Sequence, residues 1–229
     1  MNILALDTAT SSCSAALWKD GGVRSRRLRT MAHGQSEVLM GMVREVLAEA
    51  ACGFSELNLL AVTTGPGSFT GLRVGLAAAR GLALACGLPC LGVTTLETVA
   101  HQVNEGERAG KTLLVVLESK RDDVYAQAFG AGLEPLGEPE AVSPDGLVRM
   151  VPATPLLIVG DAAGRSASAL ARAGVKAILS SAPGLPDAAT VAMIASMRWR
   201  LGDESPSPVP LYLRLPDAVI PKDGGRIRP

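Results

Sequence analysis

The two halves of this chain repeat one pattern of strands. Residues 3–8 form a short apolar stretch that ends in an acid and a hydroxyl residue, and a polar turn and a second apolar stretch follow. The same order recurs from residue 114 to 119, so that Asp7 and Glu118 take the same place in the two halves. Self-similarity over so long a period indicates duplicated domains rather than a solenoid.

After each hairpin, strands and helices alternate along the chain. This order predicts mixed sheets covered by helices. Two such halves face to face describe the actin, sugar-kinase and Hsp70 (ASKHA) architecture, in which the hairpin turns clasp nucleotide phosphates. We therefore predict a duplicated α/β fold of this class. The predicted elements are an edge strand at 23–29, helices at 36–51, 71–86 and 96–103 and strands at 59–64 and 90–93 in the first half, and a strand at 125–129, a short helix at 145–150, a strand at 156–159, a helix at 166–173, a strand at 176–179 and a helix at 188–201 in the second.

The pattern also predicts how the chain divides. Residues 1–101 are expected to form a first domain, joined by the C-terminal helix 188–201, and residues 102–187 a second, smaller one. From residue 205 the sequence reads Ser-Pro-Ser-Pro-Val-Pro, a composition typical of a stiff, extended linker. Residues 202–229 are therefore predicted to form a Pro-rich tail.

Charge and cysteine usage limit the function classes. Lys plus Arg and Asp plus Glu number 22 each, which argues against a protein that grips a nucleic-acid backbone alone. The basic run at 24–29 is interpreted as the solvated face of an edge strand. Nothing reads as a signal peptide and no Cys-x-x-Cys pair occurs, so we expect a cytoplasmic protein. The apolar run 74–93 contains Arg80 and Pro89, which predicts a buried helix and strand rather than a membrane span.

A glycine-rich loop, Gly-Pro-Gly-Ser-Phe-Thr-Gly at 65–71, joins a predicted strand to a long Gly/Ala-rich helix. A helix start of this kind presents free backbone N–H groups to an anion. Ser68 or Thr70 can cap the helix. The loop lacks the Gly-Lys-Ser/Thr of a P-loop and the Gly-x-Gly-x-x-Gly of dinucleotide folds. An anion site and a tight turn that binds nothing both remain open.

Four stretches carry a resemblance to a known family. The sequences ILALDTAT at 3–10, GPGSFTGLRVG at 65–75, GVTTL at 92–96 and PLYLR at 210–214 resemble the TsaB (YeaZ) family. The resemblance is specific over residues 1–101 and weaker beyond. It implies a non-catalytic subunit of the bacterial complex that forms N6-threonylcarbamoyladenosine in tRNA. It also implies binding to the catalytic paralogue TsaD and to the ATPase TsaE, a homodimer when alone, contact with tRNA only through the complex, and no membrane.

The resemblance bears on metal and nucleotide binding. Thr95 and Val99 stand where the catalytic paralogue carries a His-x-x-x-His metal motif, and neither can ligate iron or zinc. We therefore predict no metal and no catalytic residue. Asp161 stands where nucleotide-binding relatives have a second glycine, and its carboxylate would repel a phosphate. The isolated chain is expected to bind no cofactor, with ATP or ADP held only at a partner interface.

The candidate phosphate-proximal residues are Asp7, Thr8 and Ser68. Asp7 has a second interpretation, as a turn carboxylate that accepts bonds from the backbone N–H of Ala9 or Thr10. We favour this second interpretation, because no metal ligands accompany the acid. Two other functions stay open: an autonomous ATPase or phosphotransferase that uses Asp7 and Glu118, and a glycoprotease-like metallopeptidase.

Two helices of the first half are predicted to bind partners. The helix at 36–51 has an apolar stripe that is wide for one sheet face. The helix at 71–86 is rich in small residues, which let helices approach closely, and its two arginines lie two turns apart on one face. The TsaB-like proteins use these helices for self-association and for TsaD. The predicted interface residues are Leu39, Met42, Val43, Val46, Arg73, Gly75, Leu76 and Arg80.

Overall fold

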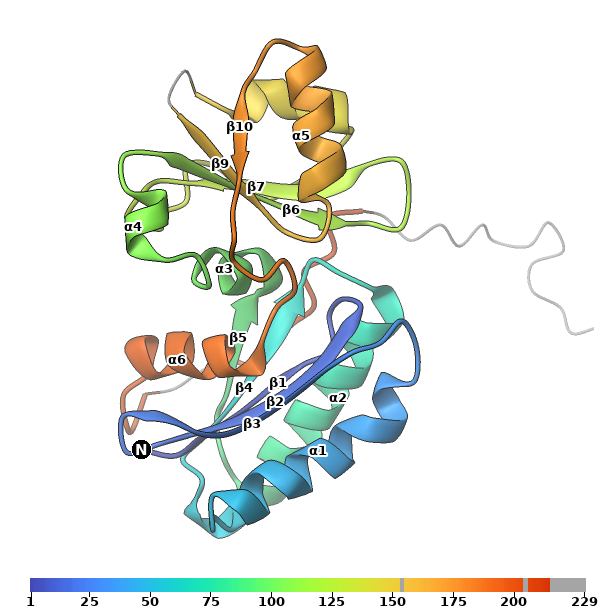
Figure 1. Ribbon diagram of the computed structural model, residues 1–229. Helices are drawn as coiled ribbons and strands as arrows, with labels where there is room; N and C mark the ends of the chain where they lie inside the picture. Colours follow the sequence, from blue (N-terminus) through green and yellow to red (C-terminus); the bar gives the residue numbers. More distant parts are fainter. Residues whose placement is uncertain (153–154, 204–205, 215–229) are drawn as a thin grey trace, which may run out of the picture.

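The computed structural model describes residues 1–152, 155–203 and 206–214. Each half folds around a five-stranded sheet, and Figure 1 shows the two sheets as separate lobes with helices between them. The first sheet has the order β3-β2-β1-β4-β5 and the second β10-β9-β6-β7-β8, so the second repeats the first. The strands are β1 (Ile3–Asp7), β2 (Ser12–Lys19), β3 (Gly22–Thr30), β4 (Leu59–Gly65), β5 (Cys90–Thr94), β6 (Thr112–Glu118), β7 (Val124–Phe129), β8 (Glu140–Val142), β9 (Leu156–Val159) and β10 (Ala177–Leu179).

Each central strand is buried on both faces, which explains its unbroken apolar sequence. In β1, Leu4 and Leu6 point into one core and Ile3 and Ala5 into another. The strand pairs antiparallel with β2 and parallel with β4. The corresponding strand β6 pairs antiparallel with β7 and parallel with β9. The predicted mixed sheets are therefore confirmed.

The helices that lie between the lobes are exchanged between the two halves. Helix α3 (Thr95–Ala100) follows the first sheet in sequence, yet Leu96 and Val99 pack on the second sheet. Helix α6 (Ala188–Arg198) follows the second sheet but packs on the first. Its first N–H, that of Ala188, donates to Ser14 Oγ at 2.9 Å. Because each inner helix returns to the other lobe, the chain crosses repeatedly between them (Figure 1).

The outer faces are covered by the remaining helices. Helices α1 (Gln35–Glu49) and α2 (Phe69–Cys86) cover the first sheet. Helix α5 (Ala163–Arg172) and a 3-10 turn at Pro144–Met150 cover the second. A second 3-10 turn, Phe54–Glu56, and the short helix α4 (Glu105–Arg108) lie in connections.

Several sequence-based elements differ from the structure, among them the helix predicted at 96–103, which ends at Ala100. Strand β8 was not predicted, because three residues are too few to show an alternating pattern. The predicted helix at 145–150 is a 3-10 turn that begins at Pro144. Helix α6 ends at Arg198, not at residue 201. The division into domains at residue 101 stays a proposal.

By length and composition, α2 is apolar enough to cross a membrane. In the structure it packs along β4, and one third of the helix is buried. The predicted strand that follows it, β5, joins the same sheet. The prediction of a buried helix and strand at 74–93 is confirmed only in part, because both elements pack in the first lobe but much of α2 stays exposed.

Candidate functional site

Asp7 lies at the end of β1, completely buried. Its Oδ1 accepts hydrogen bonds from Thr63 Oγ1 at 2.7 Å and from the Ala9 N–H at 3.1 Å. Its Oδ2 accepts from Ser12 Oγ at 3.3 Å. Burial raises the pKa of this carboxyl from 3.8 to about 7, against the lowering effect of these hydrogen bonds. The interpretation of Asp7 as a turn carboxylate bound by Ala9 is confirmed.

The glycine loop packs directly on this turn. The Ser68 N–H donates to the Ala9 carbonyl at 2.7 Å, and Thr8 Oγ1 donates to the Gly71 carbonyl at 2.7 Å. Ser68 is the N-cap of α2 and accepts from the Gly71 N–H at 3.4 Å. A Cβ at Gly67 or Gly71 would collide with a carbonyl oxygen of the turn. The glycines therefore let the loop seat on the β1–β2 turn, and this contact favours the tight-turn interpretation.

The three phosphate-proximal candidates are brought together, but the chain itself bonds their polar atoms. Asp7 receives three hydrogen bonds, Thr8 donates to the start of α2, and Ser68 caps that helix. Thr63, which makes the shortest of the bonds to Asp7, was not predicted. A hydroxyl residue at the end of the neighbouring parallel strand is the signal that could have found it.

The matching acid of the second half is held by an arginine. Glu118 accepts two hydrogen bonds from Arg165 of α5, each at 2.7 Å, in a bidentate pair. The same guanidinium donates to the carbonyls of Asp122 at 3.1 Å and Asp123 at 2.7 Å. Arg165 thus links the end of β6 to the residues that precede β7. Sequence reasoning missed it, since only the fold brings α5 beside this turn.

Asp161 is an exposed residue whose carboxyl group lies against the end of β6. Its Oδ1 accepts a hydrogen bond from the Glu118 N–H at 2.8 Å. Burial raises the pKa of the Asp161 carboxyl, and the nearby Glu118 adds to the shift. The residue links the turn after β9 to the end of β6, at the place where we expected it to obstruct a nucleotide.

The positions that would carry a metal lie in the core. Thr95 and Val99 are completely buried. His101 ends α3 and faces Glu97, with its Nε2 3.8 Å from Glu97 Oε1. Burial lowers the pKa of His101, which favours the neutral ring. Within the described residues no group of three His, Cys, Asp or Glu side chains could hold a metal ion. The metal-free assignment stays a prediction.

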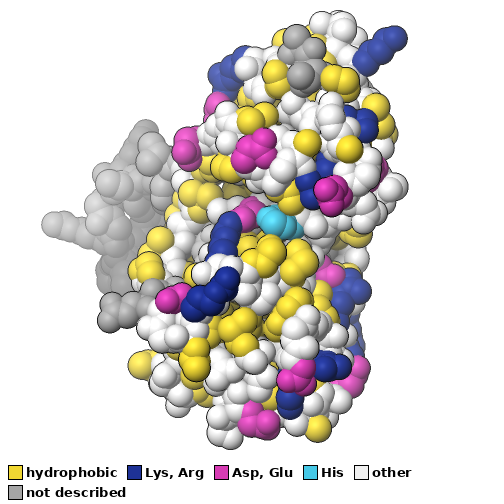
Figure 2. All heavy atoms as spheres, turned by 90° about the vertical axis from the view of Figure 1, so that its left-hand side faces the viewer, with side chains coloured by type: hydrophobic (Ala, Val, Ile, Leu, Met, Phe, Trp, Pro, Cys, Tyr) yellow, Lys and Arg dark blue, Asp and Glu magenta, His cyan; other side chains and the backbone are white. Residues whose placement is uncertain are grey.

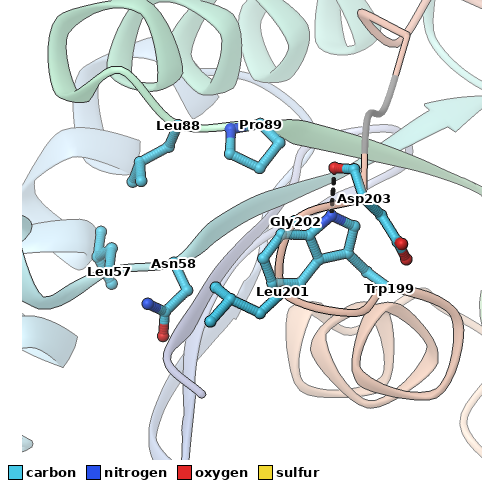
Figure 3. A pocket seen from close by; sticks show the side chains of 8 residues that line it. All are labelled: Leu57, Asn58, Leu88, Pro89, Trp199, Leu201, Gly202 and Asp203. Atoms are coloured by element: carbon cyan, nitrogen blue, oxygen red, sulfur yellow. Dashed lines mark hydrogen bonds between the residues drawn. The ribbon is translucent and has the colours of Figure 1, made fainter.

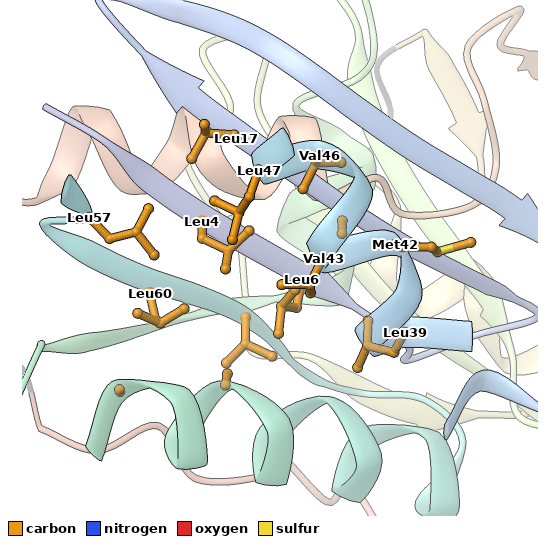
Figure 4. Close-up of a cluster of buried hydrophobic side chains, with 14 of the residues drawn as sticks. Leu4, Leu6, Leu17, Leu39, Met42, Val43, Val46, Leu47, Leu57 and Leu60 are labelled. Carbon is orange, nitrogen blue, oxygen red and sulfur yellow. The ribbon is translucent and has the colours of Figure 1, made fainter. Parts of the chain in front are cut away.

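The predicted interface on α1 is wrong. Leu39, Met42, Val43 and Val46 are at most 3% exposed and pack on the first sheet, as Figure 4 shows. The stripe that seemed too wide is the ordinary core-facing side of a helix on a sheet. Only Met40, at its margin, is 40% exposed.

On α2 the predicted residues divide between core and surface. Leu76 is buried, and Gly75 faces inward, where a Cβ would lie 2.5 Å from Thr8 Oγ1. Both are therefore wrong as contact residues. Arg73 and Arg80 are exposed. The exposed side of α2 also carries the apolar residues Phe69, 48% exposed, and Leu84, 85% exposed.

Two arginines of the basic strand β3 pair with acids of neighbouring helices and loops. Arg26 pairs with Asp187 at 2.5 Å, and Arg27 pairs with Glu45 at 2.8 Å and with Glu49 at 2.6 Å. On the face drawn in Figure 2, basic side chains stand beside acidic ones rather than in one patch. The interpretation of 24–29 as a solvated edge strand is supported, and β3 is indeed an edge of its sheet.

An open groove of about 540 Å³ lies at the opposite end of the first sheet (Figure 3). Trp199 forms one wall and donates from Nε1 to the Asp203 carbonyl at 3.1 Å. Few polar groups converge on the groove, so it offers little to orient a ligand. Its lining residues are Leu57, Asn58, Leu88, Pro89, Trp199, Leu201, Gly202 and Asp203.

Known proteins share this sequence and fold. The model of the TsaD family, tRNA N6-adenosine threonylcarbamoyltransferase, matches residues 19–154. The tRNA threonylcarbamoyladenosine biosynthesis protein TsaB of Escherichia coli K12 is 40% identical over 126 residues, which is 55% of this chain and 53% of that protein. YeaZ from Pseudomonas aeruginosa has a TM-score of 0.77 at 25% identity, covering 93% of this chain and 99% of that one. The chain belongs to the TsaB (YeaZ) family.

Further matches show how much of the chain is shared with other proteins. The alignment spans about half the length of the E. coli TsaB protein. An uncharacterised protein of Mycobacterium tuberculosis H37Rv is 33% identical over 219 residues, 94% of this chain and 93% of that protein. The activator of the 2-hydroxyisocaproyl-CoA dehydratase from Clostridium difficile, solved with bound ADPNP, has a TM-score of 0.51 at 11% identity and covers 85% of this chain and 94% of that one. This last likeness concerns the fold alone, and it confirms the predicted ASKHA-type architecture of the TsaB-like chain.

Proposed function

We propose that this chain is a non-catalytic accessory subunit in the formation of N6-threonylcarbamoyladenosine in tRNA, and that it binds and activates a TsaD-like catalytic paralogue. Family membership supports the pathway, since the E. coli relative is named for this biosynthesis. We expect the complex to form in the cytoplasm and to include a TsaE-like ATPase. Contact with tRNA is expected only through the complex, because the chain has no net charge and two arginines of the basic strand β3 pair with acids of the same chain.

The observation that carries the proposal is the state of the two hairpin acids. Asp7 is buried and bonded by three donors of the chain, and Glu118 is clamped by Arg165. An ASKHA-type ATPase needs these acids free to orient metal and water at the phosphates. Their engagement favours a subunit that does no chemistry of its own and disfavours the autonomous ATPase or phosphotransferase.

The exposed side of α2 is the surface we assign to the partner and to a homodimer of the isolated chain. Its small residues allow close approach of another helix, and its arginines offer directional contacts to carboxylates. Leu84 stands 85% exposed near the end of this face. Covering this side chain with a partner would remove its apolar surface from water, which favours association.

Reconstitution tests the catalytic assignment. Purified chain, a TsaD-like protein, tRNA and a threonylcarbamoyl donor should give modified tRNA only when both proteins are present. The chain alone should neither modify tRNA nor hydrolyse ATP. ATP turnover by the chain alone that disappears in Asp7→Asn would instead establish the phosphotransferase alternative.

A pair of variants tests the surface. Leu84→Asp should weaken binding to the TsaD-like protein, and the homodimer, by about thirtyfold, the loss expected for a hot spot of roughly 2 kcal/mol. Leu136→Asp is the matched control, because Leu136 is 51% exposed on the other lobe. Equal binding by both variants, measured by calorimetry and light scattering, would remove α2 from the interface.

A further inference from the structure

The chain returns to the gap between the lobes after α6. Residues 206–214, which we call the strap, run beside the carboxyl ends of β4 and β5 and reach the second lobe (Figure 1). The Leu211 N–H donates to the Thr64 carbonyl at 2.8 Å, which ties the middle of the strap to the end of β4. Open α/β folds bind ligands outside the carboxyl ends of parallel strands. The strap therefore covers an edge that such folds usually leave free.

The first lobe is shaped to receive the strap. Gly65 ends β4, and a Cβ there would lie 2.8 Å from the Leu211 carbonyl oxygen. Gly92 lies in β5, and a Cβ there would lie 3.0 Å from Cβ of Pro208, a buried residue of the strap. A Cβ at Gly92 would lie closer still to Cγ2 of Thr64, at 2.5 Å, so the strap is the nearest neighbour only at Gly65. The glycine at the end of β4 thus leaves room for the backbone of the strap.

Aromatic and charged contacts fix the two ends of the docked segment. The Tyr212 ring lies 5.4 Å from that of Phe69, and Arg73 stacks on Phe69 with its Cζ 3.7 Å from the ring centroid. Arg73 Nε also donates to the Tyr212 hydroxyl at 3.3 Å. Beyond Tyr212, Arg214 pairs with Asp123 of the β6–β7 turn. The strap is thus anchored to α2 in the first lobe and to a hairpin in the second.

The prolines of the strap reduce the conformational entropy that it loses on docking. Prolines at 206, 208 and 210 restrict the strap to extended conformations before it binds. Little conformational entropy is then lost on docking, so a few contacts suffice to hold the segment. The Arg214–Asp123 pair is partly exposed, which leaves the contact to the second lobe reversible.

We propose that residues 206–214 act as a clasp that holds the two lobes in one relative orientation and closes the carboxyl edge of the first sheet. Undocking the strap releases the lobes and uncovers that edge. This goes beyond the proposed function, because it concerns the isolated chain and requires no partner. The shared element is α2, which carries Phe69 and, one turn later, Arg73.

The test uses a variant altered only on the strap, Tyr212→Ala/Arg214→Gln, so that neither lobe loses a core residue. Hydrogen exchange reports docking through the Leu211 amide. Lobe orientation is measured as the distance between spin labels at Ala48→Cys in α1 and Arg172→Cys in α5, in a Cys86→Ser background. The control is Val209→Ser, since Val209 is 70% exposed on the same segment.

We expect one narrow distance distribution for the unmodified strap and for the control. In the double variant the Leu211 amide should exchange about tenfold faster or more, and the distribution should broaden. Fast exchange with an unchanged distribution would overturn the clasp, because the lobes would then be held by other contacts. A Leu211 amide that stays protected in the double variant would also overturn it, since the anchors would be misassigned.

Discussion

Asp7 and Glu118 end corresponding strands of the two lobes, yet the chain satisfies the two acids by different means. Asp7 is completely buried and takes hydrogen bonds from two hydroxyls and one N–H. Glu118 has a side chain 36% exposed and meets a full guanidinium from α5. The first lobe buries Asp7, and the second lobe pairs Glu118 with the positive charge of Arg165.

The helix that covers each turn explains the difference. Helix α2 starts with glycines, so its backbone comes down on the β1–β2 turn and leaves no room for a long side chain. At the start of α5, Arg165 contacts the β6–β7 turn with its long side chain. The acid thus has the same position in both halves, while the residues that bond it differ. In each lobe the acid is bonded by groups of the chain itself.

The largest expected effect concerns Asp7 and pH. Since burial raises its pKa from 3.8 to about 7, the folded chain keeps a proton that the unfolded chain loses between these values. The stabilisation from this proton is full below about pH 4 and is lost as pH rises through 7. Asp7→Asn should remove this pH dependence. The difference in unfolding free energy between the variant and the parent chain should therefore change by about 4 kcal/mol between pH 4 and pH 8.

Urea unfolding at a series of pH values makes this measurement. Glu118→Gln provides the comparison, because its loss of the ion pair with Arg165 should lower stability. We expect Asp7→Asn to be more stable than the parent chain at pH 8, where a buried charge is costly, and Glu118→Gln to be less stable. Parallel pH curves for Asp7→Asn and the parent chain would show that Asp7 does not hold a proton.

The next effect concerns how closely each helix approaches its turn. Gly71→Ala should cost about 2–3 kcal/mol of unfolding free energy, because the new Cβ meets the Thr8 carbonyl. Gly164→Ala is the control at the start of α5, where a Cβ meets nothing within 4 Å. There the better helix propensity of Ala should leave stability unchanged or raise it by up to about 1 kcal/mol. Equal losses at both positions would mean that the two helices approach their turns alike.

The smallest effect tests the guanidinium clamp. Arg165→Ala should lower the unfolding free energy by about 1–2 kcal/mol, since Glu118 and two carbonyls lose their donor. Arg165→Lys should not restore it, because an ammonium cannot make the bidentate pair. Arg172→Ala serves as control on the same helix, as its pair with Asp145 is largely exposed and should contribute less than about 0.5 kcal/mol. A loss at Arg165 no greater than at Arg172 would remove the clamp from the account.

The sequence predicted the parts of this fold that depend on local pattern. The repeated apolar stretches gave the central strands, and the serine and glycine at the start of α2 gave its cap and its tight turn. The same reasoning failed for α1, because an apolar stripe looks alike whether a sheet or a partner covers it. Val43 and Met42 could be assigned to the core only once the sheet beneath them was visible (Figure 4).

By itself the sequence determined the duplicated architecture, the family and the two hairpin acids, since each can be recognised from short sequence patterns and their repetition along the chain. The tertiary structure decided what surrounds those acids. Thr63 reaches Asp7 across 56 residues, and Arg165 reaches Glu118 across 47. The tertiary structure also decided that Tyr212 contacts Phe69, which lies 143 residues earlier in the sequence. Contacts between residues so far apart in the sequence leave no periodic pattern in it, because only folding brings the two residues together.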